Sequence, residues 1–205
     1  MSLYPAFLKL WGRPVLLVGG GKVAANKLRG LIEAGAVVTV VAPEISADLY
    51  RPFVRLLRRR FQPQDLDGCW FVVSAAPPEV NREVAEAARL RRVFVNAADD
   101  SDAATAYLGG VVRRGGATVA ISTGGRAPAL AGLLREALER LLPDTLSDWV
   151  TFAERLRERW RAEGVPMEER RPLLLRALEQ RYGDTGCGVR DSTPWSGPAP
   201  ATPNS

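Results

Sequence analysis

Residues that could carry chemistry lie at three places in the sequence, each directly after a short apolar run. The first is Gly19-Gly20-Gly21, which follows the aliphatic run 15–18 and forms the spacing G-x-G-x-x-A with Ala24. In dinucleotide sites with this spacing the first glycine makes a tight turn, the second admits the pyrophosphate, and the small third residue lets helix and strand pack closely. The following helix N-terminus adds N–H groups and partial positive charge for the phosphates. The pattern predicts a dinucleotide site, and a glycine-rich turn that binds no nucleotide is the alternative.

The second place is an acidic turn, in which Asp99, Asp100 and Asp102 follow the apolar run 93–96. A carboxylate at the edge of a sheet where a cofactor binds can act as a general base. The alternative is a local role, in an Asx-turn or a helix cap. A Mg²⁺ site would need more oxygen ligands than these residues supply, so we expect no metal.

The third place combines Ser122, Thr123, Gly124 and Arg126 at the start of a helical pattern. Hydroxyls, a flexible backbone, a helix N-terminus and a guanidinium together are typical of an anion-binding site. The alternative is an ordinary helix N-cap with Pro128 in the first turn. Both interpretations can hold at once, because a cap leaves some N–H groups without a partner.

Alternating apolar segments must position these residues. Apolar runs at 15–18, 37–41, 70–76 and 93–96 indicate buried strands, and the segments 22–34 and 80–91 between them have helical spacing. This alternation predicts a parallel, doubly wound α/β sheet. The basic segment 53–60 is expected to form an edge strand.

Two further segments would then meet at the carboxyl edge of this sheet, where open α/β sheets bind ligands. Pro43 ends the second strand, and Glu44 lies about 20 residues beyond the glycines, where an acidic residue often binds the ribose hydroxyls. A helix-starting carboxylate on a surface turn is the alternative for Glu44. Ala75 lies at the end of the strand 70–76.

The second half of the chain has a different pattern. A strand is expected at 117–122, followed by a helix at 129–142 with a wide stripe of leucines that suits packing against another helix, such as one from a partner subunit. Two more helices are expected at 144–163 and 168–182. At the other end of the chain, the large apolar residues of 3–13 suggest a lead-in that packs on the sheet.

Composition excludes several classes of function. The 205 residues include two cysteines and no histidine, and they carry a net charge of +5. Nucleophile systems that need histidine are excluded, and zinc or haem-iron sites lack their usual ligand. Two cysteines without a C-x-x-C motif fit a reduced, cytoplasmic protein. The sequence shows neither a signal peptide nor an apolar run near the ~18 residues of a membrane span. The basic run 58–60 lacks interleaved aromatics, so we expect neither a membrane nor a nucleic acid as partner.

Several motifs in the same order resemble the siroheme synthase N-terminal module, which is precorrin-2 dehydrogenase and, in some members, also sirohydrochlorin ferrochelatase. The resemblance covers residues 3–142 well and the helices to about 182 loosely. The matching segments are Tyr4–Arg13, Val18–Ala24, Glu33–Pro43, Asn81–Ala85, Val95–Asp99 and Ala120–Ala131.

The resemblance implies a Rossmann NAD-binding domain over 1–112, a dimerisation region over 113–143 and a small helical domain over 144–183, assembled as a homodimer. The tail 184–205, rich in Gly, Pro, Ser and Thr, is expected to be disordered. The methyltransferase domain of the fused enzymes has no counterpart in this sequence, which suggests a standalone form.

The implied reaction is NAD-dependent oxidation of precorrin-2 to sirohydrochlorin, in sirohaem or cobalamin biosynthesis, with ferrochelation left open. An Arg-rich protein suits a substrate with many carboxylates. The family's essential aspartate matches Asp99, which we expect to be catalytic. We expect NAD to contact Gly19, Gly20, Gly21, Lys22, Val23, Ala24, Pro43, Glu44 and Ala75. We expect the tetrapyrrole to contact Asn96, Ser122, Thr123, Gly124 and Arg126.

Two departures from the family pattern favour an alternative. Ala75-Ala76-Pro77-Pro78 replaces the usual Ala-Thr-x-Asp, and Ala106-Tyr107-Leu108-Gly109 replaces Phe-x-x-Pro. A tetrapyrrole-binding or carrier protein without redox turnover would tolerate both changes. A nucleotide-sensing regulatory protein is a third, more general interpretation.

Overall fold

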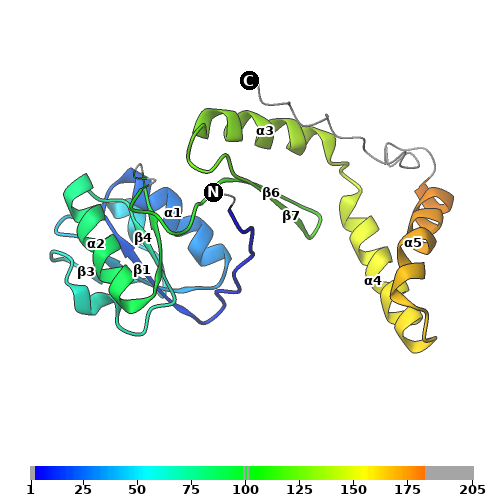
Figure 1. The fold of residues 1–205 in the computed structure, drawn as a ribbon, viewed down its shortest axis with the longest axis horizontal. Helices are drawn as coiled ribbons and strands as arrows, with labels where there is room; N and C mark the ends of the chain where they lie inside the picture. The colour runs from blue at the N-terminus through cyan, green and yellow to red at the C-terminus, as the bar shows by residue number, and fades with distance from the viewer. Residues whose placement is uncertain (1–2, 99, 101, 183–205) are drawn as a thin grey trace, which may run out of the picture. The chain divides into compact units, whose positions relative to one another are not determined.

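A parallel five-stranded sheet forms the centre of the first part of the chain (Figure 1). The structure, a computed structural model, describes residues 3–98, 100 and 102–182. The strands are ordered β3-β2-β1-β4-β5 and run parallel throughout. The order reverses between β1 and β4, which is the switch point where open sheets of this kind bind ligands. The predicted doubly wound Rossmann-like sheet is therefore confirmed.

The elements of this sheet follow the sequence in simple alternation. Their bounds are β1 Pro14–Val18, α1 Lys22–Glu33, β2 Val37–Val41, η1 Ala47–Leu49, β3 Arg55–Leu57, η2 Pro63–Leu66, β4 Phe71–Ser74, α2 Pro78–Arg91 and β5 Phe94–Ala97. The basic segment does supply the edge strand, but β3 is only three residues long.

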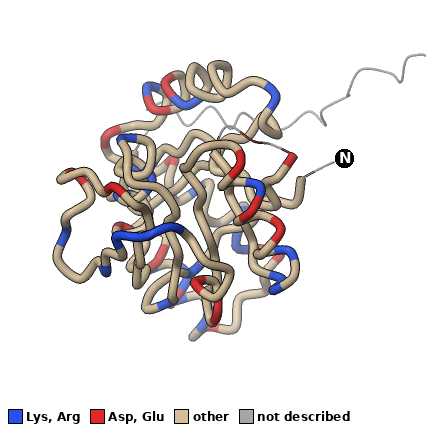
Figure 2. Tube along the Cα trace, turned by 90° about the vertical axis from the view of Figure 1, so that its left-hand side faces the viewer, with Lys and Arg blue, Asp and Glu red and all other residues tan. Residues whose placement is uncertain are grey.

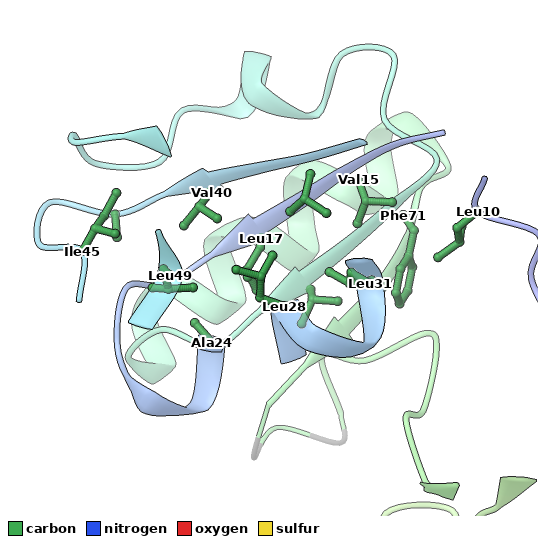
Figure 3. Close-up of a cluster of buried hydrophobic side chains, with 13 residues drawn as sticks. Leu10, Val15, Leu17, Ala24, Leu28, Leu31, Val40, Ile45, Leu49 and Phe71 are labelled. Carbon is green, nitrogen blue, oxygen red and sulfur yellow. The ribbon is translucent and has the colours of Figure 1, made fainter. Parts of the chain in front are cut away.

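The strands bury both faces because their side chains alternate between two apolar clusters. Val15 and Leu17 of β1 pack on the α1 side with Leu28 (Figure 3). Leu16 and Val18 join the other cluster, which contains Val84 of α2 together with alanines of that helix. These four residues of β1 are almost fully buried, whereas Pro14 at the start of the strand is exposed. This two-sided burial explains why the strands read as continuous aliphatic runs.

The second half contains a hairpin and three helices. β6 Gly110–Arg114 and β7 Ala117–Ile121 form a separate two-stranded sheet, and they are followed by α3 Pro128–Leu141, α4 Leu146–Ala162 and α5 Met167–Tyr182. β7 and the helices were predicted, but β6 was not. Among the described residues, those up to Val111 with Ala120–Arg135 form one compact unit, and Val112–Val119 with those from Glu136 onward form another.

Helices α4 and α5 are joined by an aromatic cluster. Trp149 and Phe152 of α4 lie 5.7 and 6.3 Å from the ring of Tyr182 on α5, measured between ring centroids. The guanidinium of Arg181 lies 4.8 Å from the Phe152 ring centroid. Partly buried aromatic rings therefore pack α4 against α5. The predicted boundaries at 112, 143 and 183 remain predictions, and the predicted disordered tail lies outside the described residues.

Candidate functional site at the carboxyl edge of the sheet

The glycine loop after β1 is held by backbone contacts to both neighbouring strands. The Gly19 N–H donates to the Val41 carbonyl at 3.0 Å, and the Ser46 N–H donates to the Gly20 carbonyl at 2.9 Å. Gly19 has a φ of +127°, and a Cβ there would overlap the Ala75 carbonyl. A Cβ on Gly20 would overlap the Glu44 carbonyl. Both glycines are therefore required by the close approach of three strand ends.

Gly21 has a different environment. A Cβ on this residue would meet no atom within 4 Å. Gly21 is the N-cap of α1 with no side-chain cap, and the first turn of α1 contains no acidic residue. This turn is the sequence Lys22-Val23-Ala24, in which Lys22 is exposed and Ala24 is fully buried against the sheet. The positive end of the α1 dipole is thus open and uncompensated, as an anion site requires.

The loop after β2 supplies the second wall of the site. Pro43 and Glu44 are exposed, while the backbone of Glu44 lies against Gly20. Ala75, at the end of β4, supplies the third wall through its contact with Gly19. The structure therefore brings together the predicted cofactor-binding residues from three separate segments.

Asn96 of β5 is a buried polar residue in this part of the fold. Its side chain is 6% exposed, and its Nδ2 donates to the Ala106 carbonyl at 2.9 Å. Its Oδ1 is buried and has no hydrogen-bond partner among the described residues. A buried acceptor without a donor is costly, so Asn96 is the residue of this strand whose polar side chain its own surroundings do not satisfy.

The acidic turn is described only in part, because Asp99 lies outside the described residues. Asp100 Oδ1 accepts a hydrogen bond from the Ala103 N–H at 3.0 Å, which is the local, turn-forming role that the sequence left open. Asp102 is exposed.

The loop before α3 is organised by its own hydroxyls. Ser122 Oγ accepts from the Gly124 N–H at 3.1 Å, and Thr123 Oγ1 accepts from the Ala127 N–H at 3.2 Å. The exposed Arg126 guanidinium donates to the Thr123 carbonyl at 3.4 Å, its one side-chain hydrogen bond within the described part of the chain. Both hydroxyls therefore fix the loop that leads into α3, and the exposed Arg126 side chain stays accessible to an anion.

Both departures from the family pattern have local reasons. A Cβ on Gly109 would overlap the Ile121 carbonyl, so the backbone here leaves no room for a proline ring. The Ala76 N–H donates to Asn81 Oδ1 at 3.2 Å, which fixes the loop after β4 without a threonine hydroxyl.

Sequence reasoning gave no functional role to Asn81, which is 2% exposed and whose side chain is hydrogen bonded to Ser74, Ala76 and Ala98. Two signals were available, the match of Asn81–Ala85 to the family pattern and a polar amide within an Ala-rich helix, but neither assigns a role to the side chain.

The sheet order and the glycine loop define an NAD(P)-binding protein of the Rossmann type. Residues 6–110 match the family described as "Putative NAD(P)-binding", and residues 114–141 match "Sirohaem biosynthesis protein central". The chain therefore belongs to this NAD(P)-binding family, and the segment that follows matches a family of sirohaem biosynthesis proteins.

Individual relatives agree with this assignment. "Siroheme synthase 3" of Aeromonas hydrophila is 44% identical over 183 residues, covering 87% of this chain and 39% of the relative. The siroheme synthase of Salmonella typhi is 40% identical over 176 residues, covering 83% and 38%. The chain thus spans about two fifths of the length of these curated relatives. A solved structure titled "SirC, precorrin-2 dehydrogenase" is 26% identical, with a TM-score of 0.67 over 88% of this chain and 92% of that one.

Among the residues that the structure describes, every helix is too short or too polar to cross a membrane.

Proposed function

We propose that this chain is an NAD-dependent dehydrogenase that oxidises precorrin-2 to sirohydrochlorin in sirohaem biosynthesis. The observation that carries the proposal is the open, uncapped N-terminus of α1 behind a glycine loop clamped by Val41, Glu44 and Ala75. The substrate class comes from the similar structure, the precorrin-2 dehydrogenase SirC, and from the siroheme synthase relatives.

The residues present fit a nicotinamide dinucleotide. Gly21 leaves open space at the helix end, where Lys22, Val23 and Ala24 begin α1 and a pyrophosphate would find N–H groups. Glu44 is exposed beside the loop and suits ribose hydroxyls, while it would repel a 2′-phosphate. We therefore assign NAD rather than NADP.

The oxidation removes two hydrogens from the substrate, one as a hydride and one as a proton. NAD⁺, when bound, supplies the hydride acceptor. We assign the proton, or the steering of the substrate, to the carboxylate of Asp99.

The tetrapyrrole substrate carries carboxylates and ring N–H groups. The exposed Arg126 guanidinium, with Ser122, Thr123 and Gly124 beside it, suits a carboxylate. The unpartnered Oδ1 of Asn96 suits an N–H donor. We further propose that the protein is a cytoplasmic homodimer with α3 in the subunit contact.

An anaerobic assay tests this function. Precorrin-2 is generated in situ, NAD⁺ or NADP⁺ is added with the purified protein, and the absorbance of sirohydrochlorin is followed. We expect the wild type to form sirohydrochlorin only when NAD⁺ is present. Asp99→Asn should abolish this activity, whereas the exposed control Asp102→Asn should retain it. Tetrapyrrole binding without product beyond the protein-free control would replace the enzyme proposal by a carrier function. Full activity of Asp99→Asn would remove the role assigned to this carboxylate.

A further inference from the structure

We infer that Asn81 is a positioning residue, which ties the ends of β4 and β5 together and so fixes the backbone that leads into Asp99. This inference rests on the proposed function, because it concerns the geometry of the same site. It rests on hydrogen bonds that a single amide makes to Ser74 and Ala76 at the end of β4 and to Ala98 after β5.

The side chain of Asn81 uses both of its polar atoms. Its Oδ1 accepts from Ser74 Oγ at 2.6 Å and from the Ala76 N–H at 3.2 Å. Its Nδ2 donates to the Ala98 carbonyl at 3.1 Å. Asn81 and Ser74 are 2% and 0% exposed, so water cannot substitute easily for these partners.

The amide connects two sides of the site. Ser74 and Ala76 flank Ala75, whose carbonyl lies against Gly19 of the cofactor loop. Ala98 follows β5 and directly precedes Asp99 in the sequence. One direct bond supports the same alignment, since the Ala98 N–H donates to the Ser74 carbonyl at 2.7 Å. Asn81 therefore sets how the cofactor side of β4 and the end of β5 lie relative to each other.

An amide is the group that these partners require. Two donors, Ser74 Oγ–H and Ala76 N–H, need an acceptor, while the Ala98 carbonyl needs a donor. A carboxylate of the same shape could serve the first two but would place a negative oxygen against the Ala98 carbonyl. Asn81→Asp therefore removes one bond of the set and leaves the volume unchanged.

The experiment compares Asn81→Asp with Ser74→Ala, which keeps the Ala76 and Ala98 bonds of the amide and removes only the hydroxyl. Asn81→Ala is a third variant that removes both the donor and the acceptor of the amide without adding charge. Three experiments are made on each protein: the anaerobic assay gives kcat and KM, calorimetry gives Kd for NAD⁺, and amide hydrogen exchange is followed for the peptide containing residues 94–98.

We expect kcat of Asn81→Asp and Asn81→Ala to fall by roughly 10- to 100-fold, because misplacement of a reacting group by about 1 Å has effects of this size. We expect Kd for NAD⁺ to stay within about 3-fold, since the glycine loop keeps its own backbone contacts. Exchange of residues 94–98 should accelerate in both Asn81 variants, while Ser74→Ala stays close to the wild type in kcat and in exchange.

Equal losses of kcat in Ser74→Ala and the Asn81 variants would overturn the inference, because a general loss of core stability would then explain both. Unchanged kcat and exchange in the Asn81 variants would overturn it as well. If the wild type produces no sirohydrochlorin, the proposed function fails, and the exchange comparison alone then decides whether Asn81 anchors the end of β5.

Discussion

Gly20 and Gly21 are neighbours in one loop, yet they are glycines for different physical reasons. The Gly20 position is filled by the backbone of Glu44, whereas the Gly21 position faces open space at the start of α1. Gly21 has a φ of −97°, which any residue can adopt. Packing therefore explains the first glycine, and access of a ligand to the helix end explains the second.

This difference predicts that alanine at Gly21 weakens NAD⁺ binding, whereas alanine at Gly20 lowers the stability of the fold. Gly21→Ala should leave the free energy of unfolding within about 0.5 kcal/mol of the wild type and raise Kd for NAD⁺ at least roughly 10-fold, because its methyl group enters the space that a pyrophosphate needs. Gly20→Ala should lower the free energy of unfolding by about 1–3 kcal/mol, since the Glu44 backbone must move. Urea unfolding and calorimetric titration measure the two quantities. Unchanged NAD⁺ affinity in Gly21→Ala would contradict the assignment of the cofactor to this loop.

The sequence could predict the role of a residue only where that role depends on its neighbours in the chain. The glycine spacing is a local property of the sequence, and Gly19–Gly21 connects β1 to α1 as the spacing predicted. Asn81 acts through Ser74, Ala76 and Ala98, which no spacing rule connects to it. Its role became visible only when the strand ends were placed in space.

Short elements of this fold depend on side chains that fix their ends. The 3₁₀-helix η2 begins with a capping box, in which Asp65 Oδ2 accepts from the Gln62 N–H at 2.9 Å. The same carboxylate pairs with Arg59, with 2.8 Å from Nη1 to Oδ2. Burial of Asp65 opposes its ionisation, but the Arg59 and Gln62 hydrogen bonds outweigh it, so the pKa of Asp65 lies below its ordinary value of 3.8.

We expect Asp65→Ala to lower the free energy of unfolding by about 1–2 kcal/mol at pH 7, a value reduced for the partial exposure of Arg59. Because the folded pKa is depressed, the stabilisation is complete above pH 3.8 and is lost as the pH falls below it through the folded pKa. The difference between wild type and variant, measured by urea unfolding at pH 7 and near pH 2.5, should therefore shrink in acid. A difference that is equally large at both pH values would contradict this account.

The sequence predicted strand β7 but not strand β6, and Gly109, directly before β6, shows why. The segment before β6 is small and glycine-bearing, which suggests a loop, yet its backbone packs directly on the Ile121 carbonyl. A strand stabilised by close backbone approach carries little hydrophobic periodicity for the sequence to reveal. The residues of β7 alternate between half-buried and exposed, and that strand was predicted.

Gly109→Ala should destabilise the protein by about 1–3 kcal/mol, because its Cβ would overlap the Ile121 backbone. The matched control is Gly132→Ala in α3, where a Cβ meets no atom within 4 Å and where Ala should stabilise the helix by about 0.5–1 kcal/mol. Thermal unfolding of the two variants should thus shift in opposite directions. Equal stability of both would show that the contact at Gly109 can relax.

Over the whole molecule, charged residues of both signs are mixed (Figure 2), whereas exposed apolar residues gather in a few segments. Figure 2 shows basic and acidic residues interspersed along the trace, so charge patterning gives little information about association. Exposed apolar residues are more concentrated. The lead-in 3–13 was predicted to pack on the sheet, yet Tyr4 and Trp11 are 93% and 84% exposed and Leu10 is buried. The leucine stripe of α3 has a similar exposure, with Leu133 and Leu141 at 64% and 74%.

A sequence predicts that a helix has an apolar face more readily than it predicts what covers that face. The α3 stripe was predicted to pack against another helix, and within this chain Ala131 is buried while Leu130, Leu133, Leu134 and Leu141 stay exposed. The proposed homodimer would bury these leucines against the same residues of a second subunit. In a two-fold contact each substitution acts twice, so one charged residue should have a large effect.

We therefore expect Leu133→Glu to raise the dimer dissociation constant by at least roughly 100-fold, because each Leu side chain contributes about 1.5–3 kcal/mol on burial and two are lost per dimer. Glu139→Gln, which helical spacing places on the opposite side of α3, serves as the control and should leave the dimer intact. Light scattering after size exclusion, over a range of protein concentrations, measures the mass of each. A wild type that remains monomeric at high concentration, or a dimer that Leu133→Glu does not weaken, would show that α3 is covered by something other than a second copy of this chain.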